Sequence, residues 1–182
     1  MDSSFVPMNS AKFIVPHVLQ EDSFDCGLAC VCMILKALGF VNLNLWEVRN
    51  KVIVSSIWTI DLAFLLRNYL PELDFTFYTA YAGARVQYKN DKFYRSSFDE
   101  DENRVNRLFS IAKNSNIKVI RMVLPLEDFK RFLSNSRFAI IALVNAKLLD
   151  CQRCQEARRI CCVPLCNNID SLVDTLRGHD YV

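Results

Sequence analysis

The chain has 182 residues, carries a net charge of +2 and is 52% hydrophobic and 23% charged, a balance typical of one globular domain rather than of a disordered chain. Its basic residues are scattered along the sequence, so charge gives no indication of nucleic acid as a partner. Since no apolar run approaches the roughly 20 residues that span a bilayer and we expect no secretory signal, the sequence indicates a protein of the cytosol, or of the cytosol and nucleus, whose cysteines stay mostly reduced.

The first expected element is a buried central helix over residues 26–38. Its side chains are apolar on nearly every face, which is typical of a helix enclosed by the rest of a domain. Ser23 and Asp25 stand where their side chains can cap its N-terminus, and Gly39 is placed to end it in the left-handed conformation. A second helix is expected over residues 46–51.

Helices and strands alternate in the rest of the chain. The expected elements are a helix from about Thr59 that ends before Pro71, a strand at 74–79, a helix that follows a capping-box pattern at Asp99 and Glu102, a strand at 117–124, a helix at 126–133 and a buried strand at 138–144. This order indicates an α+β fold. We expect one domain over residues 13–182, after a loose lead-in over residues 1–12.

The most specific motif runs from Gln20 to Cys30 and places Cys26 in the first turn of the buried helix. Helix N-termini favour the thiolate, which is the nucleophilic form of a cysteine. Gln20 is expected in a loop from which its side-chain amide could donate to an oxyanion beside the nucleophile. Gly27 would let the backbone approach a substrate closely.

A cysteine nucleophile also needs a base within hydrogen-bond reach. The chain has only two His, and we interpret His17 as structural because it lies in an extended segment. His179 is distant in sequence from Cys26 but free to be close in space, so it is the candidate base. The alternative is that Cys26 simply belongs to the core, since cysteine is among the most frequently buried residue types.

A second group of thiols lies towards the C-terminus. Cys151 and Cys154 form a Cys-x-x-Cys pair, which is half of many structural zinc sites. Cys161 together with Cys162 or Cys166 could complete a tetrahedral set of four thiolates. The alternative is an Arg-bearing surface loop with unrelated thiols. Apart from this structural zinc, the sequence indicates no cofactor.

Two smaller features at helix starts are interpreted as structural. Ser56 or Thr59 is expected to cap a helix on which Trp58 packs, and the alternative gives Trp58 and Asp61 a role in an active-site cleft. The acidic side chains at 99–102 are expected to offset a helix dipole, with metal binding as the alternative.

Longer segments resemble known families. Residues 20–39, a Gln followed by Asp-Cys-Gly and an apolar helix that ends in Gly, resemble the nucleophile motif of the bacteriocin-processing cysteine peptidases, which have a papain-like fold. The chain from Val15 onwards also resembles the guanylyl cyclase domain-containing family of animals, plants and fungi. The segments that carry this resemblance are Ser-Ile-Trp-Thr-Ile-Asp-Leu-Ala at 56–63, Phe-Tyr-Arg at 93–95, Arg-Val-Asn-Arg-Leu-Phe at 104–109, Ala-Ile-Ile-Ala-Leu-Val-Asn at 139–145 and the Cys-rich tail that ends in Gly-His at 178–179.

The resemblance implies an α+β domain with the papain-like cysteine-peptidase fold, truncated at its C-terminal strands. Residue by residue, Cys26 matches the nucleophile, Gln20 the oxyanion donor and His179 the base. In the related peptidases an Asp or Asn before a Pro, on the next strand, orients the histidine. This chain ends at Val182 and has Asp180 where the relatives have the first of two apolar residues. We therefore expect this form to be weak or inactive as an enzyme.

The family name implies a different activity, the formation of cyclic GMP from GTP. The residues alone give this activity no independent support, because the chain has no Gly-rich phosphate-binding motif. A third alternative is a non-catalytic binding or scaffold protein that keeps the fold. For the thiol enzyme and the scaffold, the sequence indicates an unidentified protein or peptide partner rather than nucleic acid or a membrane.

Overall fold

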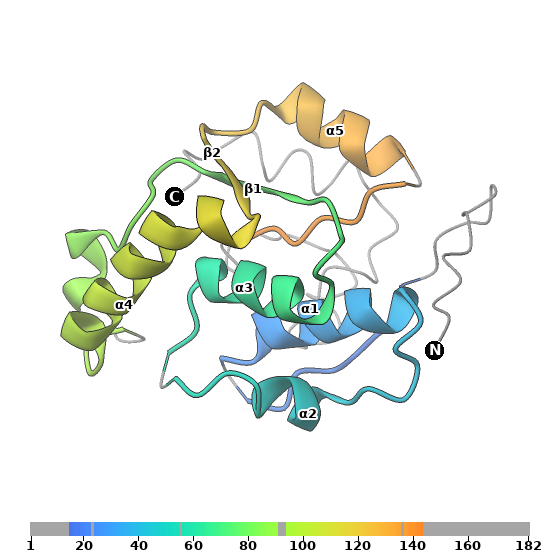
Figure 1. The fold of residues 1–182 in the computed structure, drawn as a ribbon, viewed down its shortest axis with the longest axis horizontal. Coiled ribbons are helices and arrows are strands. Elements are labelled where there is room, and N and C mark those ends of the chain that lie inside the picture. Colours follow the sequence, from blue (N-terminus) through green and yellow to red (C-terminus); the bar gives the residue numbers. More distant parts are fainter. Residues whose placement is uncertain (1–14, 23, 55, 91–93, 136, 144–182) are drawn as a thin grey trace, which may run out of the picture.

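The computed structural model describes residues 15–143, except 23, 55, 91–93 and 136. The elements in this part of the chain are the helices α1 (Cys26–Ala37), α2 (Leu45–Arg49), α3 (Thr59–Tyr69), α4 (Phe98–Ile111) and α5 (Leu126–Ser134), the strands β1 (Thr76–Thr79) and β2 (Lys118–Arg121), and the 3₁₀ turns η1 (Val86–Asn90) and η2 (Lys113–Ser115). This mixture of helices with a small sheet confirms the predicted α+β class (Figure 1).

The sheet in the described residues has two parallel strands, β1 and β2, with Thr76 opposite Lys118 and Thr79 opposite Arg121. Parallel neighbours need a long crossover connection, and here α4 lies in that connection. Both strands fall inside the strands that the sequence predicts, so the alternating pattern located them correctly.

The buried strand predicted at 138–144 is wrong over its described part, residues 138–143. This segment forms no strand, and Phe138 and Leu143 are 52% and 63% exposed. Ile141 instead packs against the hydrophobic core around α1. A short apolar run does not by itself specify a neighbouring strand, and the helices that α1 packs against are α2 and α3.

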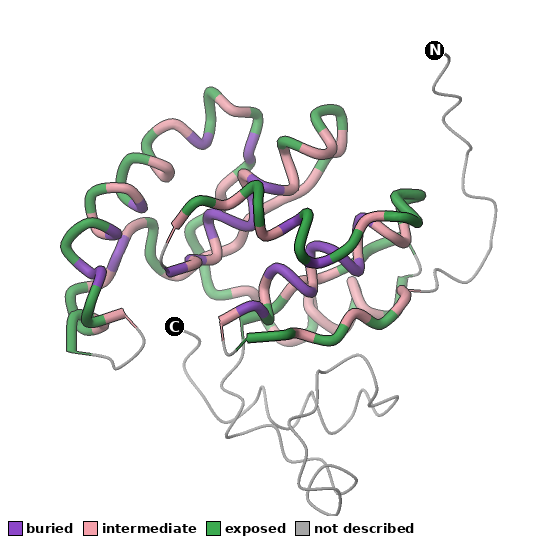
Figure 2. The backbone as a smooth tube through the Cα atoms, turned by 90° about the horizontal axis from the view of Figure 1, so that it is seen from below, coloured by how far each residue is buried: buried purple, intermediate pink, exposed green. Residues whose placement is uncertain are grey.

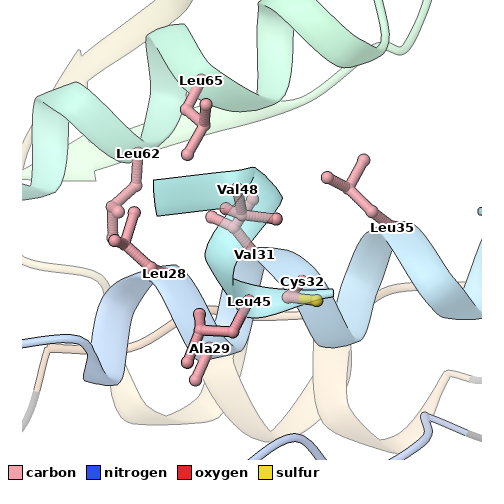
Figure 3. Packing of buried hydrophobic residues seen from close by; sticks show 9 residues of the cluster. All are labelled: Leu28, Ala29, Val31, Cys32, Leu35, Leu45, Val48, Leu62 and Leu65. Carbon is pink, nitrogen blue, oxygen red and sulfur yellow. The ribbon is translucent and has the colours of Figure 1, made fainter. Parts of the chain in front are cut away.

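Two hydrophobic clusters form the described interior, and α3 contributes to both. The first, here called the α1 core, consists of Leu28, Ala29, Val31, Cys32, Leu35, Leu45, Val48, Leu62 and Leu65 (Figure 3). The second, the α4 core, consists of Trp58, Ile60, Ala63, Ala84, Phe98, Val105, Ala112 and Ile117. Helices α1 and α3 consist almost entirely of buried and intermediate positions, α4 also carries several exposed ones, and α5 has no buried residue (Figure 2).

Helix α1 ends as predicted, with Gly39 in a left-handed conformation (φ = 107°). The N–H groups of Gly39 and Phe40 donate to the carbonyl oxygens of Lys36 and Leu35, a pair of bonds that satisfies the last turn of a helix. The Lys36 Nζ also donates to the carbonyl oxygen of Val41 (2.8 Å). These bonds tie the loop after α1 back onto the helix.

The side-chain cap of α1 that was predicted for Asp25 is wrong. Asp25 occupies the N-cap position, but its carboxylate accepts no hydrogen bond from the first turn. The carboxylate is fully buried and accepts from the Asp22 N–H and from Arg49. Ser23, the other predicted cap, lies outside the described residues. Asp25 therefore links the preceding loop to α2, because a buried carboxylate is stabilised by a guanidinium more than by the helix end alone.

The predicted caps of α3 and α4 are also wrong. Ser97 occupies the N-cap position of α4 and its hydroxyl donates to Asp101, so the predicted capping box does not form. At α3, Trp58 occupies the N-cap position and its N–H donates to Asp61 Oδ2 (2.8 Å). The Ser56 hydroxyl also donates to Asp101. The hydroxyls of Ser56 and Ser97 thus both donate to the buried Asp101 carboxylate instead of capping a helix.

Candidate thiol site at the start of helix α1

Cys26 is the first residue of α1, and its side chain is exposed. The other thiols of this helix are more enclosed, with Cys30 partly buried and Cys32 fully buried. Helix α1 thus presents Cys26 to solvent at its N-terminus, where unpaired N–H groups and the helix dipole favour an anion. Cys26 therefore does not belong to the core, and it lies where the sequence predicts a nucleophile.

Cys32 is the buried counterpart of Cys26. Its Sγ lies 3.9 Å from the carbonyl oxygen of Leu43. Burial raises the pKa of Cys32; the Lys36 charge opposes this shift and the Glu47 charge adds to it. Because the thiolate is the reactive form, Cys32 serves as an internal reference for a slow thiol in labelling experiments.

Gln20 lies in the loop that leads into α1, as the sequence predicts. Its Nε2 donates to the carbonyl oxygen of Asp22 (2.9 Å), and the same carbonyl accepts the N–H of Asp25 (3.2 Å). One of the two N–H donors of the carboxamide therefore holds the side chain against its own loop.

Arg49, at the end of α2, contacts the loop that leads into α1. Its Nη1 lies 2.6 Å from Asp22 Oδ2 and 3.4 Å from Asp25 Oδ2. Its Cζ lies 4.8 Å from the centre of the Phe24 ring. The Oδ1 of Asp25 is buried without a hydrogen-bond partner among the described residues. The conformation of the loop before Cys26 thus depends on contacts with a second helix.

Gly27 has a packing role that differs from the predicted one. A Cβ added at this position would lie 2.8 Å from Leu62 Cδ1 on α3. The missing side chain therefore lets α1 and α3 approach each other closely, whereas the sequence suggested room for a substrate. The direction of the absent Cβ could not be read from the motif, because it depends on where α3 packs.

Replacing Gly27 with valine is expected to destabilise the chain by about 1–3 kcal/mol, because the added methyl groups would overlap Leu62 in a packed interface. Urea unfolding of the full chain measures this loss. The Leu62→Ala change should cost less stability in the Gly27→Val background than in the wild type, since it makes room for the valine. Simply additive losses from the two changes would contradict this account.

A buried ion cluster joins α3 to α4, and sequence reasoning missed it. Arg104 pairs with Asp61 and with Asp101 (Nη2 to Oδ1, 2.7 Å), and it donates to the Ser56 carbonyl oxygen (3.1 Å). The Asp61 and Asp101 side chains are only 8% and 3% exposed. The i, i+3 spacing of Asp101 and Arg104 is a signal for that pair. Nothing in the spacing points to Asp61, because it lies 43 residues from Arg104.

The two carboxylates share one guanidinium, and their pKa values move in opposite directions. Burial raises the pKa of Asp61, and the hydrogen bond from Arg104 offsets this only in part. Burial also acts to raise the pKa of Asp101, but hydrogen bonds from Arg104, Ser56 and Ser97 outweigh it, so that pKa is lowered. Within the acidic segment at the start of α4, Asp101 is therefore buried and bonded to the interior, whereas Asp99 and Glu100 are exposed in the first turn of the helix.

Trp58 packs, as predicted, among aromatic rings beside this cluster. Its ring centre lies 4.6 Å from that of Tyr94, 6.1 Å from Tyr88 and 6.3 Å from Phe98. It is 9% exposed, and its indole Nε1 has no hydrogen-bond partner among the described residues. With Asp61 in the ion cluster, the structural interpretation of both residues agrees with the observed contacts.

The other predicted site residues lie elsewhere. His179 and the zinc candidates Cys151, Cys154, Cys161, Cys162 and Cys166 are outside the described residues, so the candidate base and the zinc site stay predictions. His17 is exposed in the segment before α1. Within the described ranges, no group of three or more His, Cys, Asp or Glu side chains is arranged to hold a metal ion. No helix in that part of the chain is long and apolar enough to cross a membrane.

Comparison with known proteins decides the family. A family model described as Guanylylate cyclase matches residues 15–182. The chain belongs to the guanylylate cyclase family. It is 37% identical over 137 residues to Guanylyl cyclase 1 of Arabidopsis thaliana, an alignment that covers 75% of this chain and 49% of that relative. The chain thus spans about half the length of this relative.

The family resemblance inferred from sequence is therefore confirmed. The range matched to the guanylylate cyclase family contains the loop before α1, the ion cluster and His179. No solved structure matches the chain. The α+β class thus comes from the structure, and the family from the match.

Proposed function

We propose that this chain carries a cysteine-peptidase-like thiol site, in which Cys26 is the nucleophile, Gln20 the oxyanion donor and His179 the base, within a papain-like domain over residues 13–182. The observation that carries this proposal is the position of Cys26. It is exposed at the N-terminus of a helix whose following residues contribute to the α1 core, which is a setting that suits an activated thiolate.

The proposed reaction is acyl transfer from an amide or peptide bond. The Cys26 Sγ attacks the carbonyl carbon, and the carbonyl oxygen becomes an oxyanion that accepts a hydrogen bond from the Gln20 carboxamide. His179 takes the Cys26 thiol proton as the attack occurs and gives that proton to the leaving amine when the C–N bond breaks. Water attacks the thioester and releases the acid, and the thiol is restored.

We infer slow turnover for this form. The Gln20 Nε2 donates to the Asp22 carbonyl oxygen, so the carboxamide is not held solely for an oxyanion. Electrostatic stabilisation is most effective when donors are already aimed at the developing charge. The matching non-catalytic function is the binding of a protein or peptide that is not cleaved. Such a partner would bind at the same exposed N-terminus of α1.

Peptide-resolved labelling with iodoacetamide near neutral pH tests the activated thiolate. Cys26 is expected to react at least about tenfold faster than Cys32, because Cys26 is exposed at a helix N-terminus and Cys32 is buried with a raised pKa. Cys30, partly buried on the same helix, is the second reference. Equal rates at Cys26 and Cys30 in the folded chain would leave Cys26 an ordinary surface thiol.

A second candidate function is the formation of cyclic GMP from GTP. What favours it is the name of the relative, Guanylyl cyclase 1, at 37% identity. Purified chain incubated with GTP and Mg²⁺ or Mn²⁺ should then yield cyclic GMP at a rate that does not change on further purification. A Cys26→Ala variant separates the two functions, since it should remove thiol chemistry and leave nucleotide cyclisation.

A further inference from the structure

We propose that Arg49 is a positioning residue of the thiol site, which holds the loop from Gln20 to Cys26 in the conformation that a substrate carbonyl requires. This inference rests on the proposed thiol function. Arg49 belongs to α2 and stands outside the sequence motif around Cys26, so no motif identifies it. Its role follows from three contacts of its guanidinium.

These contacts hold the loop at three of its residues, Asp22, Phe24 and Asp25. The guanidinium lies 2.6 Å from Asp22 Oδ2, 3.4 Å from Asp25 Oδ2 and 4.8 Å from the centre of the Phe24 ring. A planar guanidinium can stack on a ring while its N–H groups reach carboxylates. A lysine ammonium keeps the charge but lacks the plane and the fork of donors.

Hydrogen bonds of the Asp22 backbone connect the Arg49 contact to Gln20 and Asp25 in the thiol site. Its N–H donates to Asp25 Oδ2 (3.2 Å), and its carbonyl accepts both the Asp25 N–H (3.2 Å) and the Gln20 Nε2 (2.9 Å). A displacement of Asp22 therefore changes the direction of the Gln20 carboxamide. Asp25 precedes Cys26 directly, so the same displacement reaches the first residue of α1.

Helix α2, which carries Arg49, is anchored in the α1 core. Val48 and Leu45 of α2 are 0% and 5% exposed in the α1 core. Asn44 and Glu47 form a capping box at the start of α2, which holds that short helix in place. Arg49 thus extends from a rigid element onto a loop, which is the arrangement that a positioning residue needs.

The Arg49–Asp22 pair does not act mainly through stability. The two side chains are 37% and 49% exposed, and exposed ion pairs contribute little to folding. Asp25 is different, since its side chain is fully buried and needs a nearby positive charge. An Arg49→Lys change keeps that charge and removes the planar contacts, so it alters position with little loss of fold.

The test uses a peptide aldehyde as the probe. Its carbonyl carbon accepts the Cys26 Sγ, the thiol proton moves to the carbonyl oxygen, and that oxygen lies beside Gln20. Binding is measured as protection of Cys26 from iodoacetamide. Arg49→Lys is expected to weaken protection at least about tenfold, because small misplacements of an oxyanion donor are costly, while the labelling rate without aldehyde changes by less than about threefold.

Two further variants sharpen this test. Asp22→Asn should weaken protection similarly, and the double variant should be no worse than either single one if both act through one contact. Arg131→Lys is the matched control, since Arg131 also pairs with a carboxylate, Asp128 (2.9 Å), and lies over a ring, Phe132 (5.6 Å), but on α5. Arg131→Lys should leave the protection of Cys26 unchanged. In urea unfolding, the free energy of unfolding of every variant should lie within about 0.5 kcal/mol of the wild-type value.

The outcomes separate the two proposals. If the aldehyde fails to protect Cys26 in the wild-type chain, the thiol function is wrong and the role of Arg49 falls with it. If the aldehyde protects the wild type and Arg49→Lys equally, the thiol function stands and the positioning role is wrong. Protection lost in Arg49→Lys and Asp22→Asn but kept in Arg131→Lys supports both.

Discussion

Replacing Arg104 with methionine is expected to destabilise the folded chain by about 3–5 kcal/mol, the range for removing one partner of a buried ion pair. Asp61 and Asp101 would remain buried on facing helices without the guanidinium that both contact. Methionine fills a similar volume, so the loss would come from charge and hydrogen bonds rather than from a cavity. Urea unfolding, followed by circular dichroism, measures it.

Two controls distinguish this effect from a general sensitivity to lost cations. Adding Asp61→Asn and Asp101→Asn to Arg104→Met removes the uncompensated charges and should recover part of the stability. Lys130→Met removes the Lys130–Glu127 pair on α5 (2.9 Å), whose side chains are 32% and 81% exposed, and should cost no more than about 0.5 kcal/mol. A loss of that small size in Arg104→Met would mean that the cluster contributes little to folding.

Replacing Leu28 with alanine is expected to cost about 2–5 kcal/mol, the range for truncating a buried leucine. Leu28 is 0% exposed and packs in the α1 core with Leu62 and Leu65 of α3. Its truncation would leave a cavity beside the first turn of α1, two residues after the exposed Cys26. Urea unfolding gives the loss directly, and faster iodoacetamide labelling of the buried Cys32 reports the increased opening of the same core.

Leu19→Ala is the matched control for this truncation. Leu19 lies in the segment before α1 and is 69% exposed, so its loss should change stability by less than about 0.5 kcal/mol. Labelling of Cys32 should stay at the wild-type rate in this variant. A similar loss of stability in Leu28→Ala and Leu19→Ala would contradict the prediction, because burial of the Leu28 side chain would then make no difference.

The elements that periodicity specifies were predictable, and their partners were not. Helix α1 and its end at Gly39 follow from local chemistry, because an apolar helix and a left-handed glycine need no distant residue. The segment at 138–143 reads as a strand for the same kind of reason, yet a strand also needs a neighbour. Its apolar Ile141 instead packs against the α1 core.

The candidate site divides in the same way. The positions of Gln20 and Cys26 follow from the motif, since the start of a helix is a local property. The contacts from Arg49, the closeness of Gly27 to Leu62 and the pairing of Asp61 with Arg104 all depend on how helices pack. The predicted cap at Ser56 failed because its hydroxyl donates to the buried Asp101, and the one at Asp25 failed because its buried carboxylate accepts from the Asp22 N–H and from Arg49.

Helix α3 joins the two hydrophobic cores, because it contributes buried side chains to both. Leu62 and Leu65 lie in the α1 core, while Ile60 and Ala63 lie in the α4 core. Neither core can close until this one helix has docked, so the halves before and after it cannot complete their folding independently. A nascent chain that has emerged only as far as α2 would have its α1 leucines uncovered, and protection of that surface would await the synthesis of α3.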